Sequence, residues 1–227
     1  MNERSSTVSG EYTVGVQGWF SCAWHAMMAR PNVVLRGLAV MLLFALVSLG
    51  LGMLPGGAYI GYIVQFMVGQ VLQAGWYLFC LRLVREEEVS PAVIFEPFKR
   101  FWQVWRVAIV VPLLTALGLL LFVIPGLYFW ARFGMAIFAA VDRRLDVNEA
   151  LEFSSRITEG NRLQILLLHL MIAAIGIVLV MPSVLEMNNL GMITLLAYVF
   201  IMTPLAGTAY AAAYDSLVET KAAEEEE

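Results

Sequence analysis

The chain has 227 residues, of which 60% are hydrophobic and only 14% are charged, and its mean hydropathy is +0.77. A soluble globular chain is nearer half apolar and one quarter charged, so a soluble domain of this length could not cover so much apolar side chain. The composition therefore excludes an ordinary soluble enzyme, a disordered chain and a nucleic-acid binder. It predicts an all-α fold: a polytopic bundle of membrane-spanning helices.

Six apolar stretches are long enough to cross the hydrocarbon core of a bilayer, which is about 30 Å thick. In chain order they cover residues 33–54, 59–81, 107–124, 127–144, 163–185 and 190–214, within about two residues. We expect residues 1–16 to form a disordered cytoplasmic N-terminus, residues 17–215 a single membrane domain, and residues 216–227 an acidic cytoplasmic tail. The fourth stretch is short unless it includes the charged residues at its end, so a re-entrant fourth segment is the alternative to six full spans.

The 14 Lys and Arg residues gather on one side of this arrangement. They precede or open the first span, surround the connections between spans two and three and between spans four and five, or lie in the tail. Short loops rich in Lys and Arg stay in the cytoplasm, so both termini are expected there. Arg132 alone does not fit, because it falls in the outer half of the fourth span.

The three outer corners each carry a proline: Pro55, Pro125 and Pro182. A cytoplasmic amphipathic or aromatic segment precedes each outgoing span, so the pattern predicts three Pro-cornered hairpins that share one orientation. Many secondary transporters are instead marked by inverted repeats with broken midplane helices. This chain lacks that signature, which disfavours alternating-access transport.

The cytoplasmic segments are predicted to be helices at the membrane surface. In residues 146–160, Asp146 and Glu149 have the spacing of a capping box, and Gly160 supplies the helix end. Tryptophan and phenylalanine in the other segments favour headgroup depth. These aromatic residues are Trp19, Trp24, Phe98, Trp102 and Trp105. Two interpretations remain open: a cuff that senses the membrane or binds a partner, and simple linkers on the lipid surface.

Arg132 is the most informative single residue. A charge in the middle of a span costs about 2.5–3.5 kcal/mol on insertion scales, so it needs a partner or water. Because helical side chains lean toward the helix N-terminus, which is here the outer surface, we expect Arg132 to reach outward. The functional alternative is a buried ion pair or an anion site, with Glu186 as the nearest outer acid.

Three further polar residues lie within spans. His169 is predicted to make a structural hydrogen bond between helices, because its one fellow histidine, His25, is distant in sequence. Gln65 and Gln73 alternate with glycines at four-residue spacing in the second span. That stripe is typical of a close helix–helix seam, and the alternative is a polar lining for a solute path.

The search for catalytic and metal-binding motifs finds none. The chain lacks H-E-x-x-H, G-x-S-x-G, Walker and G-x-G-x-x-G patterns, so we expect neither enzymatic activity nor a cofactor. Cys22 and Cys80 form no C-x-x-C pair, which excludes a zinc or redox motif and predicts two inert thiols.

Residues 124–162 carry a family resemblance. Ile124, Pro125, Gly126, Tyr128, Arg132, Asp142, Ala150, Leu151, Ser154, Gly160 and Asn161 form its pattern. The stretch resembles a group of bacterial integral membrane proteins of unknown function, similar to the membrane domain attached to some glycerophosphoryl diester phosphodiesterases. The resemblance implies six helices and a bacterial inner-membrane location. It carries over no catalytic residues, because the phosphodiesterase chemistry belongs to a separate soluble domain.

We therefore expect a non-enzymatic scaffold or accessory protein of the bacterial cytoplasmic membrane. Its partners would be membrane lipids, together with a membrane protein or a second copy of the chain, and not nucleic acid. The alternative is a transporter or channel for a small solute or a lipid, with a polar path near Arg132, Gln65, Gln73 and His169.

Overall fold

The computed structural model describes residues 14–55, 57–185 and 187–226, and the regular structure in these ranges is entirely helical. Six helices in the described ranges are long and apolar enough to cross a membrane: Pro31–Gly52, Gly57–Val84, Pro91–Leu121, Val123–Asp142, Arg162–Val184 and Asn189–Glu225. Each overlaps one predicted stretch, so the prediction of an all-helical, multi-pass membrane protein is confirmed. The predicted disordered N-terminus lies almost wholly outside the described residues.

The first hairpin follows a short leading helix, α1 (Val16–Ala29). Arg30 leaves helical geometry, with φ −137° and ψ 57°, because the ring of Pro31 disfavours the α conformation in the residue before it. Pro31 then opens the outgoing helix α2 (Pro31–Gly52). The returning helix is continuous but mixed in type, and it comprises α3 (Gly57–Val64), the π-helix η2 (Gln65–Gly69) and α4 (Gln70–Val84).

The second hairpin begins with a 3₁₀-helix, η3 (Pro91–Arg100), followed by α5 (Phe101–Leu121). Phe122 is extended, with φ −159° and ψ 151°, and turns the chain back. The returning segment is broken at Gly134 into α6 (Val123–Phe133) and α7 (Ala136–Asp142).

The third hairpin is preceded by α8 (Val147–Ile157). The Asp146 N–H donates to Glu149 Oε2 at 3.1 Å, as the predicted capping box requires, and Gly160 takes a left-handed φ of +86°. The spans themselves are α9 (Arg162–Val184), α10 (Asn188–Ala197), the π-helix η4 (Tyr198–Met202) and α11 (Thr203–Glu226). Because α11 remains helical to Glu226, the predicted tail continues the last helix.

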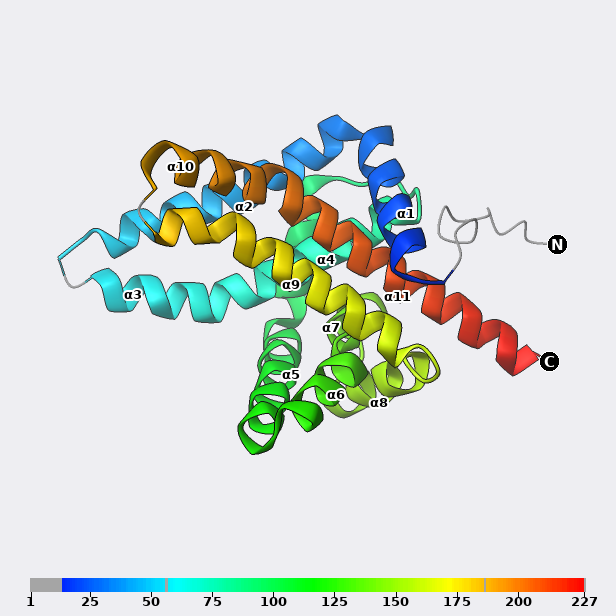
Figure 1. Ribbon diagram of the computed structural model, residues 1–227. Coiled ribbons are helices and arrows are strands. Elements are labelled where there is room, and N and C mark those ends of the chain that lie inside the picture. Colours follow the sequence, from blue (N-terminus) through cyan, green and yellow to red (C-terminus); the bar gives the residue numbers. More distant parts are fainter. Residues whose placement is uncertain (1–13, 56, 186, 227) are drawn as a thin grey trace.

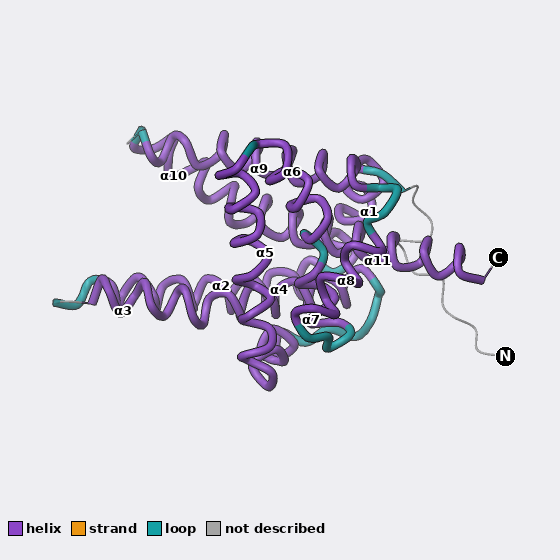
Figure 2. Tube along the Cα trace, turned by 90° about the horizontal axis from the view of Figure 1, so that it is seen from below, coloured by secondary structure: helices purple, strands orange, loops and turns teal. Residues whose placement is uncertain are grey.

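The three prolines do not occupy equivalent positions. Pro55 lies in the turn between α2 and α3, Pro125 is the third residue of α6, and Pro182 lies inside α9. The hairpins also differ in direction. The tips of the α2–α3 and α9–α10 hairpins point to the same side of the molecule, whereas the α5–α6 hairpin runs crosswise to both (Figures 1 and 2). In this conformation, the three hairpins cannot all cross the same membrane at right angles.

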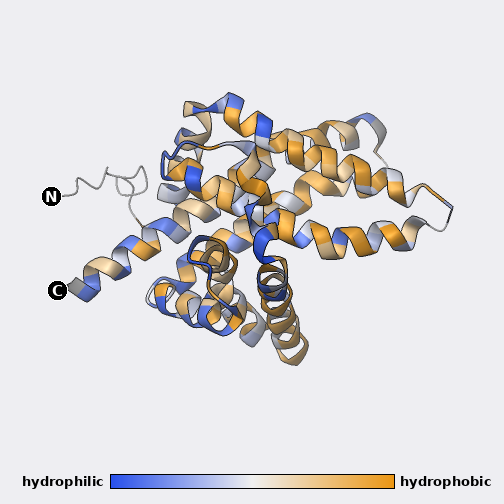
Figure 3. Ribbon diagram, turned by 180° about the vertical axis from the view of Figure 1, so that it is seen from behind, coloured by the Kyte–Doolittle hydropathy of each residue, from blue (hydrophilic) through white to orange (hydrophobic). Residues whose placement is uncertain are grey.

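The core lies away from the hairpin tips, where α1, α4, α7 and α11 meet. Its largest side chains are fully or almost fully buried: Trp19, Trp76, Phe79, Phe138 and Tyr214. Toward the tips, apolar residues cover the outer surfaces of the helices (Figure 3). Leu120 and Ile124 at the α5–α6 tip are 84% and 81% exposed. Such surfaces require lipid as their solvent.

Candidate functional site

An open groove of about 870 Å³ lies beside α9. Its lining residues come from α4, α6, α9, η4 and α11. Along α9 it extends from His169 to Val184, a distance of about 22 Å at 1.5 Å per helical residue. We call this feature the α9 groove.

Small side chains on facing helices leave the room for this groove. Ala173 and Gly176 line it from α9, and Ala206 and Gly207 line it from α11. Near the tip α9 packs closely on α10, but it has few contacts with α11 beyond that point. The two walls therefore separate along this part of α9, and Gly176 and Gly207 leave space for the rings of Tyr198 and Trp76 at the edge of the groove.

The groove is mainly apolar but contains an unused hydrogen-bond donor. Trp76 lines it from α4 and is 1% exposed, yet its indole Nε1 has no hydrogen-bond partner among the described residues. The nitrogen lies against Gly207, since a Cβ built on that glycine would be 2.6 Å from Nε1. A buried donor without a partner costs about 1–3 kcal/mol, so a ligand or water that supplied an acceptor oxygen would be bound favourably.

Two of the predicted polar residues meet in this groove. Gln73 and His169 both line it, Gln73 from α4 and His169 from α9. The His169 Nδ1 lies 2.7 Å from the Ile165 carbonyl oxygen, one turn back in α9. The predicted bond between helices is thus replaced by a bond within one helix, and the imidazole ring packs between Trp130 and Tyr210.

Gln65 lies elsewhere. It is exposed, its side chain lies over Gly69, and it is not among the groove residues. The predicted stripe fails at this point because η2 is a π-helix, whose wider turn shifts the register of the residues that follow. Residues before and after η2 therefore face different neighbours, and Gln73 alone of the two glutamines reaches the groove.

Arg132 is directed neither outward nor into the groove, which corrects the expectation that it extends to the outer surface. Its Nε donates to Ser155 Oγ on α8 at 2.7 Å. The Ser154 and Thr158 hydroxyls donate in turn to the Arg132 carbonyl at 2.9 and 3.3 Å. These bonds hold the end of α6 against α8, one of the segments predicted to be cytoplasmic. Glu186, the acid proposed as its partner, lies outside the described residues.

The aromatic residues assigned to the membrane interface divide into two groups. Trp24 and Trp102 are exposed, and Phe98 and Trp105 are partly buried. Trp19 is instead fully buried, and its Nε1 donates to Ser216 Oγ on α11 at 2.8 Å. The interfacial assignment of Trp19 is therefore wrong, because the face of α1 that carries Trp19 packs on α11.

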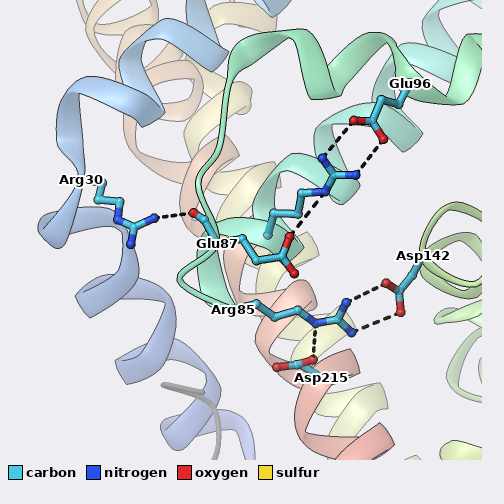
Figure 4. Close-up of polar contacts among 7 residues, drawn as sticks. Arg30, Arg85, Glu87, Glu96, Asp142 and Asp215 are labelled. Atoms are coloured by element: carbon cyan, nitrogen blue, oxygen red, sulfur yellow. Dashed lines mark hydrogen bonds and ion pairs between the residues drawn. The ribbon is translucent and has the colours of Figure 1, made fainter. Parts of the chain in front are cut away.

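An ionic cluster ties several helices together (Figure 4). Arg85 binds Asp142 through two nitrogens at 2.7 and 3.2 Å, and its Nε binds Asp215 at 2.8 Å. Burial lowers the pKa of Arg85, but the hydrogen bonds and charges of Asp142 and Asp215 outweigh this effect and raise it above its ordinary value. The guanidinium thus remains charged and joins α4, α7 and α11.

Two neighbouring arginines extend this cluster. Arg82 makes a two-pronged contact with Glu96 of η3, at 2.9 and 2.7 Å. Arg30, between α1 and α2, donates to the carbonyl oxygens of Glu87 and Glu86 at 2.6 and 2.9 Å. All these acceptors belong to the structure itself, so the cluster fixes helices and presents no reactive centre.

The sequence analysis missed both the aromatic polar groups of the groove and this cluster. Trp76 was counted only as part of an apolar span, although an indole N–H in mid-span is itself a signal because it needs a partner. Asp215 was placed at the end of the membrane domain, one residue past the last predicted span, and was given no role. Arg85, Asp142 and Asp215 each lie at the predicted cytoplasmic end of a span. The three side chains were therefore expected at the same depth, and this could have indicated an ion-pair cluster.

Comparisons with known proteins add no relative: no family model, no curated protein and no solved structure matches the chain. The resemblance noted for residues 124–162 therefore remains a prediction. In the described part of the chain, no three His, Cys, Asp or Glu residues gather as metal ligands would.

Proposed function

We propose that the chain is a non-enzymatic accessory protein of the bacterial cytoplasmic membrane that holds an apolar lipid chain in the α9 groove. The observation that carries this proposal is the groove itself: a long, mainly apolar hollow whose buried Trp76 N–H lacks an acceptor. Apolar walls with a few oriented polar groups are typical of ligand sites. A lipid offers both parts, a hydrocarbon chain for the walls and an ester carbonyl oxygen for the indole.

The proposed orientation places both termini in the cytoplasm, with the α2–α3 and α9–α10 hairpins crossing the membrane and their Pro-bearing corners outside. The α5–α6 hairpin would lie within the membrane, crosswise and near its inner side, which extends the re-entrant alternative from the fourth segment to the third and fourth together. This arrangement accounts for Arg132, because α6 then stays close to the cytoplasmic helix α8. Every Lys and Arg thereby falls on one side, as the distribution of charges in short loops requires.

The amphipathic segments fit the same proposal. Trp24 and Trp102 are exposed at the ends of the bundle, where tryptophan favours headgroup depth. The apolar outer faces of α2 and α9 leave room for lipid, a membrane-protein partner or a second copy of this chain. A transport path has less support, because Arg132 and Gln65 lie outside the groove that holds Gln73 and His169.

A matched pair of substitutions tests the groove. Ala173→Phe places a ring in the groove, whereas Ala174→Phe places the same ring on the exposed face of α9. Protein in liposomes is photolysed with phosphatidylcholine that carries a diazirine in its acyl chain. Adducts are then mapped by mass spectrometry at Met202, which lines the groove and is only 4% exposed.

We expect adducts at Met202 in the native protein and in Ala174→Phe, and a loss of at least about fivefold in Ala173→Phe. A fivefold loss corresponds to about 1 kcal/mol, the scale of burying one or two methylene groups. Absence of adducts in the native protein, or equal adducts in the two variants, would refute occupation of the groove by lipid.

A further inference from the structure

Two arginines converge at the junction of α6, α8 and α9. The Arg132 Nε donates to Ser155 Oγ at 2.7 Å, and an Arg162 terminal nitrogen lies 3.5 Å from the Ser155 carbonyl oxygen. Both guanidinium groups also lie near the Tyr128 ring, with their central carbons 6.0 and 5.2 Å from its centroid. The two positive charges are therefore close neighbours around one serine and one tyrosine.

No carboxylate neutralises this pair among the described residues. The ion pairs of the described chain engage other cations, including Arg82 and Arg85, and none includes Arg132 or Arg162. Glu152 on α8 and Glu159 in the turn after α8 lie near Ser155 in sequence, but neither forms an ion pair with either arginine. Two like charges held together without a counter-charge repel each other, and an external anion would relieve that repulsion.

The donors at this junction remain only partly used. Arg162 Nε is buried and has no hydrogen-bond partner among the described residues. The Tyr128 hydroxyl accepts a bond from an Arg162 terminal nitrogen at 2.9 Å, which leaves its own proton available to donate. Both arginines are half-buried and Tyr128 is 40% exposed, so the junction is open to a ligand.

We infer that Arg132, Arg162 and Tyr128 form a binding site for the phosphate group of an anionic phospholipid. The planar guanidinium fork matches phosphate oxygens in pairs, and basic pockets between membrane helices on the cytoplasmic side are suited to anionic headgroups. Arg162 is the first residue of the span α9, which puts the site at the membrane boundary where headgroups lie. The site is separate from the α9 groove and does not require the groove to be occupied.

The test measures phosphatidylglycerol binding to detergent-solubilised protein by native mass spectrometry. Phosphatidylcholine serves as the zwitterionic comparison and inorganic phosphate as the soluble competitor. The variant is Arg132→Gln/Arg162→Gln. Its control is Arg36→Gln/Arg106→Gln, which removes two charges from exposed arginines with no ion pair among the described residues.

We expect the native protein to prefer phosphatidylglycerol over phosphatidylcholine, and the first variant to bind phosphatidylglycerol about tenfold more weakly while the control keeps native affinity. Tyr128→Phe, which removes only a hydroxyl, should weaken binding by about fivefold even if the double variant fails to fold. Unchanged affinity in Tyr128→Phe or in a folded double variant would overturn the inference. Displacement of the lipid by millimolar inorganic phosphate would overturn the lipid assignment in favour of a free-ion site.

Discussion

Arg85 and Asp142 are 57 residues apart in sequence, yet their side chains meet through two hydrogen bonds of 2.7 and 3.2 Å. Asp215 completes the contact at 2.8 Å from Arg85 Nε, and the Tyr214 hydroxyl donates to Asp142 at 3.1 Å. Three helices are thus joined at one level of the bundle by a single guanidinium group, and each of these side chains is mostly buried.

Replacement of Arg85 by methionine should therefore destabilise the fold. It removes the cation that Asp142 and Asp215 share, and loss of one member of a buried ion pair costs about 3–5 kcal/mol. Because the cluster is not fully enclosed, we expect the free energy of unfolding to fall by about 3 kcal/mol. The measurement is the midpoint of thermal unfolding in detergent, which should be lower than in the native protein. Arg36→Met, at an exposed position, should change stability by less than about 0.5 kcal/mol. Equal midpoints for the two variants would show that the cluster contributes nothing.

The contact between α1 and α11 gives a second prediction. Trp19→Phe keeps a buried aromatic ring but removes the donor that binds Ser216 Oγ at 2.8 Å. We expect a loss of about 1–2 kcal/mol in unfolding free energy, because the buried Ser216 oxygen loses the donor it accepts from, while its hydroxyl still donates to the Ala213 carbonyl oxygen at 3.0 Å. Trp24→Phe, on the exposed side of the same helix, is the matched control and should be neutral. If Trp24→Phe proved the more damaging change, α1 would lie with the opposite face against the bundle.

The two cysteines should be unreactive in the folded protein. Burial raises the pKa of Cys22 to about 12, and the negative charges of Asp215, Glu219 and Glu86 act in the same direction. Cys80 is completely buried. N-ethylmaleimide should therefore label neither thiol at pH 7 or pH 9, and both after denaturation in SDS. Rapid labelling of the native protein at pH 9 would show that α1 separates from α11.

The same shift in pKa predicts a dependence of stability on alkaline pH. The Cys22 pKa is higher in the folded protein than the ordinary thiol value of 9.0, so the folded state holds its proton more tightly. This contribution to stability is complete below about pH 9 and is lost as the pH rises toward 12. Cys22→Ser should reduce that alkaline loss in a thermal unfolding series, and a series unchanged from the native protein would contradict the burial of Cys22.

The direction of the α5–α6 hairpin predicts a labelling pattern in cells. Met53 is 76% exposed at the tip of the α2–α3 hairpin, so Met53→Cys should react with a membrane-impermeant maleimide added from outside. Phe122→Cys, at the turn between α5 and α6, should remain unlabelled, because the proposed orientation puts this exposed position in lipid. Ser90→Cys should react only after the membrane is permeabilised. Equal labelling of Phe122→Cys and Met53→Cys would show that α5 and α6 cross the membrane like the other hairpins.

The helical fold and the approximate positions of the six apolar helices were predictable because they depend on local runs of apolar residues. Gly160, which follows α8 with a left-handed φ of +86°, was also placed correctly, since the backbone effect of glycine acts within a few residues. The π-helices η2 and η4 were not predictable, because nothing in their composition distinguishes them from α-helix. Their effect was large, since η2 separated Gln65 from Gln73.

Long-range packing explains the remaining differences. Trp19 was assigned to the membrane interface because tryptophan favours headgroup depth. Only its hydrogen bond with Ser216, 197 residues later, shows that it is buried. Arg132 was assigned by its depth in a span that was assumed to be straight and upright. The break at Gly134 and the crosswise hairpin bring it to α8, and neither is encoded in a local pattern. Gln73 and His169 were singled out by their polarity within spans, but the groove that both line is built from α4, α6, α9, η4 and α11, and that packing is not visible in the sequence.

The most direct test of lipid binding is a structure determined in discs cut from native membrane without detergent. We predict a continuous elongated density along α9 between His169 and Val184, with an oxygen-bearing end within hydrogen-bonding distance of Trp76 Nε1. A groove closed by direct packing of α9 on α11, with no density between them, would contradict the proposed function.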